Sequence, residues 1–115
     1  MEYKMKLLKD PFKRILSGKK TIEIRLFDEK RQKLRVGDTI EFSQFSNLEN
    51  KTKVEIVDLL RYETFKDLLN DFGGEYYGYP EDCPFNDLLD NIYKIYLKEQ
   101  EQKYGVLGIK IRILT

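Results

Sequence analysis

Lys20, Glu23 and Arg25 stand close together in the segment SGKKTIEIRLFDEKR, which covers residues 17–31. Isoleucines alternate with polar residues there, a pattern that is typical of a β-strand. Glu23 and Arg25 are two residues apart, so their side chains share one face of the strand, about 6.6 Å from each other, and Thr21 lies on the same face. In a binding site, Arg25 offers its planar guanidinium to a phosphate or a base edge, and Glu23 accepts a base N–H. On an ordinary strand the same face is simply solvated.

A short helix is predicted directly before this strand. Asp10 is a candidate N-cap and Gly18 is a candidate C′ residue. The residues between them include three apolar side chains at the i, i+3, i+4 spacing of a buried helix face, namely Phe12, Ile15 and Leu16. Lys20 follows the turn after this helix, so we expect its amine to reach the same cleft as Glu23 and Arg25.

The remaining pattern predicts further strands and helices on both sides of this segment. The expected strands cover residues 3–8, 39–45, 52–62 and 106–114, the expected helices cover 65–72 and 85–97, and loops are expected at 46–51 and 73–84. Because a helix does not stand between every pair of consecutive strands, largely antiparallel pairing is favoured. We therefore expect an α+β fold built on a small, mostly antiparallel β-barrel with flanking helices.

One apolar face of each strand is expected to enter the core of this barrel. The residues predicted to be buried there are Ile22, Ile24, Phe42, Ile56, Ile109 and Ile111. Segment 52–62 has apolar residues on both faces, which indicates burial on both sides. The helix at 85–97 is expected to pack against the barrel through Leu88, Leu89 and Ile92.

The composition limits the chemistry that is available. The 115 residues fit one domain, residues 1–115. There is no histidine and one cysteine, Cys83. This excludes an internal disulfide, zinc sites of the usual Cys/His kind, and Ser-His-Asp or Cys-His catalysis. No cofactor is implied. No apolar run reaches the ~20 residues of a membrane span, so no membrane partner is expected, and a single cysteine suits a reducing, cytoplasmic location.

Charge is distributed unevenly along the chain. Residues 1–37 contain 12 Lys and Arg against 5 Asp and Glu, whereas residues 38–115 contain 9 against 15. The basic first third attracts phosphates, and the acidic remainder repels a nucleic acid that would wrap the whole domain. The asymmetry is compatible with a local nucleic-acid contact and equally with a solvated, Lys-rich surface.

Three segments resemble those of one known family. Residues 18–25 (GKKTIEIR) are similar to the signature of ASCH domains, residues 34–38 (LRVGD) to the turn that follows it, and residues 104–109 (YGVLGI) to the family's closing strand. The resemblance covers nearly the whole chain. It implies a PUA-like, mostly antiparallel β-barrel with a cleft beside the signature strand, and a role with RNA or modified nucleosides.

Some small bacterial ASCH proteins are amidohydrolases that remove the acetyl group from 4-acetylcytidine with a catalytic Lys, Thr and Glu. The resemblance places Lys20 on their Lys and Glu81 on their Glu, while Glu23 stands where they have Thr. A carboxylate does not replace a hydroxyl nucleophile in acyl transfer, and Thr21 lies one side-chain repeat, about 6.6 Å, away along the strand. If the chain is an enzyme, the resemblance implies catalysis by Lys20, Glu23 and Glu81.

The loop at 73–84 is rich in glycine and tyrosine. Tyr76, Tyr77 and Tyr79 either form a wall on which a base stacks or cover the mouth of the barrel with their hydroxyls in water.

The sequence favours a binding module for RNA or a nucleotide or nucleoside. The alternatives are a hydrolase that acts on a modified nucleoside or on RNA, and an adaptor domain without a nucleotide. The ligand-binding residues are predicted to be Lys20, Thr21, Glu23, Arg25 and Tyr79.

Overall fold

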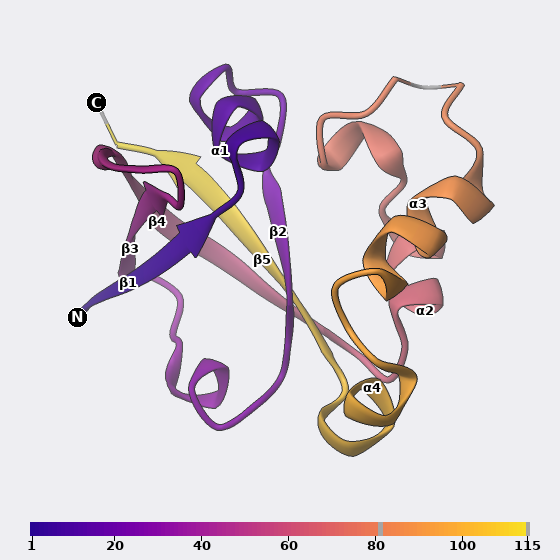
Figure 1. Cartoon of the computed structure of the whole chain (residues 1–115). Coiled ribbons are helices and arrows are strands. Elements are labelled where there is room, and N and C mark those ends of the chain that lie inside the picture. Colours follow the sequence, from indigo (N-terminus) through magenta and orange to yellow (C-terminus); the bar gives the residue numbers. More distant parts are fainter. Residues whose placement is uncertain (81, 115) are drawn as a thin grey trace.

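Five strands form one sheet in the computed structural model, which describes residues 1–80 and 82–114 (Figure 1). In spatial order the strands are β1 (Glu2–Leu7), β3 (Thr39–Gln44), β4 (Asn47–Tyr62), β5 (Val106–Ile113) and β2 (Ile22–Leu26). β1 runs parallel to β3, and the other neighbouring pairs are antiparallel. The sheet curls into a half-barrel with β1 and β2 as its two edges. The expected α+β fold with mostly antiparallel strands is confirmed.

Helices cover the sheet on two sides. They are α1 (Lys9–Leu16), α2 (Phe65–Asp71), α3 (Phe85–Tyr93) and α4 (Lys98–Tyr104), with short 3₁₀ helices η1 (Arg31–Lys33) and η2 (Gly74–Tyr76). Figure 1 shows α2 and α3 together on one side of the sheet and α1 close to β1 and β2. Within the described ranges, no helix has the length and apolar character that a membrane crossing needs.

The curled sheet separates two apolar cores. The inner core lies inside the curl and is formed by Leu7, Phe12, Ile15, Leu34, Ile40, Phe42, Val54, Ile56, Leu107, Ile109 and Ile111. The outer core lies between the sheet and helices α2 and α3, and its buried members are Ile22, Leu26, Phe65, Leu68, Leu69, Tyr77, Leu88 and Val106. The predicted packing of Leu88, Leu89 and Ile92 against the sheet is confirmed. Of the six predicted core residues, Ile22 is buried in the outer core and not inside the curl, and Ile24 is only half-buried, because it lines the cavity described below.

A bulge explains why β4 is apolar on both faces. The pairing with β5 shifts by one residue between Ile56 and Asp58, which leaves Val57 without a partner in the ladder. Ile56 faces the inner core before the bulge and Leu59 packs against it afterwards, while Leu60 lies under the helices. The extra residue therefore shifts the alternation by one, so that even-numbered residues face the inner core before the bulge and odd-numbered residues face it afterwards.

Two predicted boundaries near the N-terminal half are wrong. The loop expected at 46–51 belongs largely to β4, because the β3–β4 connection turns over at Phe45 and Ser46 and pairing resumes at Asn47. Asp10 is not the N-cap of α1. The helix begins at Lys9, with Leu8 at the N-cap position, and Asp10 lies in its first turn. A carboxylate there is still stabilised by the positive end of the helix dipole.

The helix expected at 85–97 is also wrong in its extent. α3 ends at Tyr93, and α4 starts a new helix at Lys98. The backbone N–H of Leu97 donates to the Gln100 side chain at 2.9 Å, which satisfies one of the free donors at the new helix start. The two helices therefore meet at an angle that brings α4 back toward the start of β5.

A buried carboxylate ties three helices together. Glu101 of α4 is 5% exposed. Its Oε2 atom accepts the backbone N–H of Phe65, the first residue of α2, at 2.8 Å, and its two oxygens accept the Tyr93 hydroxyl of α3 at 2.8 and 2.9 Å. The carboxylate thus acts as a cap for α2 that is supplied from a distant part of the chain.

Replacing Glu101 by alanine should lower the free energy of unfolding by about 2–4 kcal/mol. The Phe65 N–H and the Tyr93 hydroxyl would lose a charged acceptor in a buried place, and each unsatisfied donor costs about 1–3 kcal/mol. Urea unfolding measures the change. Glu99→Ala, on the exposed side of the same helix, is the control and should shift stability by no more than about 0.5 kcal/mol. Equal effects of the two substitutions would contradict the capping role of Glu101.

Candidate functional site

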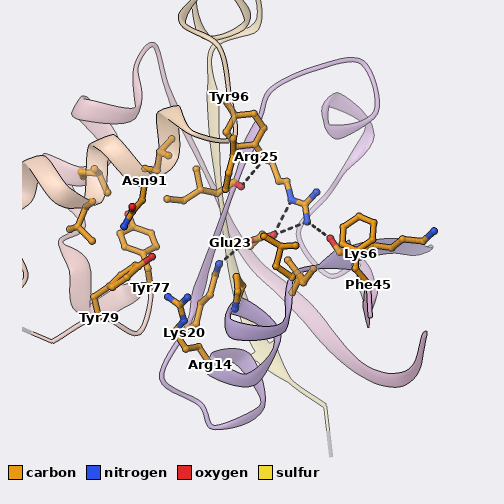
Figure 2. A pocket seen from close by; sticks show the side chains of 18 residues that line it. Lys6, Arg14, Lys20, Glu23, Arg25, Phe45, Tyr77, Tyr79, Asn91 and Tyr96 are labelled. Carbon is orange, nitrogen blue, oxygen red and sulfur yellow. Dashed lines mark hydrogen bonds and ion pairs between the residues drawn. The ribbon is translucent and has the colours of Figure 1, made fainter. Parts of the chain in front are cut away.

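A cavity of about 380 Å³ lies beside β2, between α1 and the end of β1 on one side and α3 on the other (Figure 2). Apolar side chains make up much of its lining, among them Leu7, Leu8, Pro11, Ile24, Leu69, Leu88 and Ile92. The centre of the cavity is different, because Lys20, Glu23 and Arg25 meet there. We call these three side chains the ionic floor.

Glu23 binds both cations of the ionic floor at once. Its Oε1 atom is 2.7 Å from Lys20 Nζ, and its Oε2 atom accepts from Arg25 Nε at 2.9 Å and lies 2.8 Å from Arg25 Nη2. The three side chains are between 5% and 14% exposed. They form a nearly desolvated network with one net positive charge, so this strand face is not an ordinary solvated one.

The ionic floor sets its own protonation states. Burial by itself raises the pKa of the Glu23 carboxyl, but the Lys20 and Arg25 charges and their hydrogen bonds outweigh burial and hold that pKa at about 2. Burial by itself lowers the pKa of the Arg25 guanidinium, and the Glu23 charge reverses the effect and raises it. At neutral pH Glu23 is therefore a carboxylate, and its low pKa makes it a poor general base.

Strand pairing explains why these polar side chains point inward. Glu23 pairs with Ile109 and Arg25 with Leu107 in the antiparallel β2–β5 ladder. Directly paired residues point to the same face of a sheet, and both partners belong to the inner core. Because β2 is an edge strand, Arg25 can reach past it, and its Nη2 atom donates to the Lys6 carbonyl of β1 at 3.1 Å. A side chain thus bridges the two edges of the half-barrel.

The turn after α1 places Lys20 in the site. Gly18 has a φ of +77°, which favours glycine and reverses the chain after the helix, as predicted. The backbone N–H of Lys20 then donates to the Arg14 carbonyl at 3.0 Å. An isolated antiparallel bridge pairs Lys20 with Tyr77. The strand that carries the ionic floor is thereby held against the tyrosine-rich loop.

Aromatic side chains from that loop form one wall of the cavity. Tyr77 is buried, its hydroxyl donates to the Phe72 carbonyl at 2.9 Å, and burial raises its pKa. The Tyr79 ring lies 4.7 Å from the Arg14 guanidinium carbon. Gly78, with a φ of +86°, leaves room for this contact, because a Cβ atom there would lie 2.7 Å from Arg14 Cδ.

The structure brings most of the predicted site residues together. The side chains of four predicted residues line this one cavity, namely Lys20, Glu23, Arg25 and Tyr79. Thr21 is not among the lining residues, and Glu81 lies outside the residues that the structure describes.

Five further polar or aromatic side chains line the cavity without having been predicted, namely Lys6, Arg14, Phe45, Asn91 and Tyr96. Asn91 carried a signal in the sequence, because it interrupts the apolar stripe of α3 between Leu88 and Ile92. A polar residue in such a stripe either finds a buried partner or faces a cavity. Tyr96 lies four residues after Ile92, at the same helical spacing. Phe45 has no signal in the sequence beyond its position before a turn.

The lining also limits the chemistry of the cavity. None of the described residues that line it is Ser, Thr or Cys, so it presents no hydroxyl or thiol of the kind that serves as an acyl-transfer nucleophile. In the part of the chain that the structure describes, no three Cys, Asp or Glu side chains lie close enough to hold a metal ion.

Lowering the pH should reduce the free energy of unfolding through protonation of Glu23. Its pKa is about 2 in the folded protein against a usual 4.5, so its contribution to stability is complete above about pH 5 and is lost as the pH falls toward 2. At 1.36 kcal/mol per pKa unit, the contribution is about 3 kcal/mol. The difference in unfolding free energy between wild type and Glu23→Gln should therefore shrink by about 3 kcal/mol from pH 6 to pH 2 in urea titrations. A difference that does not change with pH would contradict the assigned network; Glu99→Gln is the exposed control.

Comparisons with known proteins agree with this geometry. The family model of the ASCH domain matches residues 5–115. The crystal structure of hypothetical protein PH0355 superposes with a TM-score of 0.87 at 33% identity, covering 99% of this chain and 100% of that one. The solution structure of protein PF0455 from Pyrococcus furiosus gives a TM-score of 0.77 at 32% identity, with 99% and 98% coverage.

A third structure shows the same fold at greater distance. The crystal structure of ASCH from Zymomonas mobilis has a TM-score of 0.64 at 16% identity and covers 96% of this chain and 66% of that one. No curated protein matches the chain. ASCH domains have a PUA-like fold, and the family is associated with RNA binding. The family model spans nearly the whole chain, and the chain therefore belongs to the ASCH domain family.

Proposed function

We propose that the chain binds one nucleotide, either free or within an RNA, in the cavity that contains the ionic floor. The observation that carries the proposal is the meeting of a desolvated ionic floor and an aromatic wall in a cavity of about 380 Å³. Pockets for small ligands begin at about 300 Å³, so the space suits one nucleobase with its sugar. The association of ASCH domains with RNA binding supports this choice of ligand.

The ionic floor retains hydrogen-bonding capacity for a ligand. An ammonium group has three hydrogens, and within the described residues Lys20 Nζ binds one acceptor, Glu23 Oε1, at 2.7 Å. Lys20 can therefore donate to a ligand oxygen, and Glu23 Oε1 has a second lone pair for a ligand N–H. Side by side, the two groups complement a base edge that presents a carbonyl next to an N–H.

The walls suit the faces of a flat ring. Tyr79 lines the cavity with Arg14 stacked against it, and Ile92 and Tyr96 also contribute to the lining. Stacking of a base on an aromatic side chain contributes about 1–3 kcal/mol. The apolar lining excludes water, and this strengthens the hydrogen bonds to the ionic floor.

Hydrolysis of a modified nucleoside is the alternative, and the geometry favours it less. The sequence resemblance assigns Glu23 to the position of the amidohydrolase Thr, and the Glu23 pKa of about 2 disfavours proton uptake near neutral pH. The described lining residues include no alcohol or thiol that could replace that Thr. A water attacking without a base would leave the reaction slow, so recognition explains the site better than acyl transfer does.

Removing Lys20 or Tyr79 should weaken nucleotide binding. Lys20→Met keeps the side-chain volume but loses a charged donor worth about 1.5–3 kcal/mol, which corresponds to about 10–150-fold in Kd. Tyr79→Ala should cost a similar factor through lost stacking. Calorimetric titration with the four ribonucleoside monophosphates measures both effects. Lys98→Met and Lys103→Met, on α4 and outside the cavity lining, are the controls and should bind like the wild type.

Thermal unfolding must show that each variant is folded at the titration temperature. Equal losses in Lys20→Met, Lys98→Met and Lys103→Met would indicate diffuse charge attraction instead of a specific site. Binding that falls steeply with salt in every variant would lead to the same conclusion.

Wild-type protein should show no robust turnover of 4-acetylcytidine. The reason is the absence of a nucleophile beside Lys20 in the described lining, together with the low pKa of Glu23. Chromatographic detection of released cytidine measures the reaction in wild type, Lys20→Ala and Glu23→Ala. Rapid release by wild type that disappears in both variants would make this chain an amidohydrolase and overturn the recognition proposal.

A further inference from the structure

A second groove starts where the cavity ends. Lys6, Arg25 and Phe45 line both spaces, so the two adjoin. The second groove has a volume of about 700 Å³ and runs between β1 and the residues of η1, along the open seam of the half-barrel. We call it the seam groove.

The seam groove is strongly basic. Seven Lys and Arg side chains line it against one carboxylate, that of Glu41. Three of these cations have acidic partners, since Arg25 binds Glu23, Arg31 binds Asp28 at 3.0 Å, and Lys51 lies 3.8 Å from Glu41. Among the described residues, the other four have no carboxylate within 4 Å, and they are Lys4, Lys6, Lys30 and Lys33.

Protection of an edge strand accounts for only part of this charge. Lysines on an exposed edge prevent another strand from pairing with it, and Lys4 and Lys6 on β1 serve that purpose. Lys30 and Lys33 lie at η1, which is not a strand. Their side chains nevertheless line the same groove from the opposite side. Cations from two unrelated segments therefore converge on one channel, and this convergence points to an anionic ligand.

An exposed aromatic ring stands at the junction of the two spaces. Phe45 lies in the β3–β4 turn, is 58% exposed, and has Lys6 Nζ 5.8 Å from its ring centroid. Figure 2 shows Phe45 and Lys6 on the opposite side of Arg25 from Tyr77 and Tyr79. An exposed aromatic ring beside a cation is the arrangement on which successive bases of a single strand stack.

We infer that the seam groove holds the phosphodiester chain of a single-stranded RNA whose flanking nucleotide occupies the cavity, and that Phe45 stacks on the next base. The inference rests on the proposed function of the cavity and extends its ligand from a nucleotide to a strand. Lys4 and Lys6 are two residues apart on β1, hence about 6.6 Å, a spacing suited to consecutive phosphates of an extended strand. A duplex does not fit this path, because its bases are paired and cannot enter the cavity.

The test compares a strand with a single nucleotide on the same variants. Fluorescence anisotropy measures binding of fluorescein-labelled RNA octamers of each of the four bases, and calorimetry measures binding of the corresponding monophosphates. The variants are the double substitution Lys4→Gln and Lys33→Gln, and Phe45→Ala. The matched control is the double substitution Lys98→Gln and Lys103→Gln on α4.

For wild type, at least one octamer should bind 10-fold or more tightly than its monophosphate. The double substitution in the groove should weaken octamer binding about 10-fold and reduce the slope of log K against log salt by about 1.4, the value for two lost phosphate contacts on a single strand. Phe45→Ala should weaken octamer binding about 5–150-fold. Monophosphate binding should stay unchanged in the double groove variant, because neither Lys4 nor Lys33 lines the cavity, and the control should bind both ligands like wild type. Because Phe45 also lines the cavity, Phe45→Ala should weaken octamer binding more than monophosphate binding.

The outcomes separate the two proposals. An octamer that binds no more tightly than its monophosphate, or that is indifferent to the groove substitutions, overturns the seam groove and leaves the cavity proposal intact. Octamer binding that depends on the groove but is unaffected by Tyr79→Ala, with no monophosphate binding, overturns the cavity. An annealed RNA duplex that competes as well as the octamer overturns the assignment to a single strand.

Discussion

The buried carboxylate of Glu23 is the constraint on which the site depends. Burying an unpaired carboxylate in an apolar interior costs a large desolvation free energy, so Glu23 requires both Lys20 and Arg25. Lys20 must leave the α1 turn at the correct height, and Arg25 must remain on an edge strand. Arg25 in turn donates a hydrogen bond to the Lys6 carbonyl of β1. The half-barrel stays open as a sheet, yet its two edges are linked through one side chain, and the cavity lies at that link.

The same network limits what the site can do. Two cations hold Glu23 in its charged form, which suits hydrogen bonding to a ligand N–H and disfavours proton abstraction near neutral pH. Lys20 keeps donors for a ligand while its position is fixed by the ion pair and by the backbone bond to Arg14. The floor is therefore rigid before a ligand arrives, and preorganisation of this kind favours recognition.

The sequence predicted the parts of the fold that depend on local pattern. Alternation placed Glu23 and Arg25 on one face, and Gly18 was recognised correctly as the residue that ends α1. What the sequence did not predict depends on tertiary contacts. The capping of α2 by Glu101 joins residues that are distant in the chain. Likewise, the role of Phe45 as a lining residue follows from how the β3–β4 turn meets β2, which no local pattern encodes.

A nuclear magnetic resonance titration of the wild-type domain with ribonucleoside monophosphates tests the central claim most directly. We expect saturable shifts for at least one of them, centred on backbone amides of residues 20–25, 77–79 and 91–96, which include much of the cavity lining. Residues 98–104 of α4, which carry exposed lysines away from it, should not shift. Shifts spread over all lysine-rich surfaces, or no saturable shift with any of the four nucleotides, would contradict it.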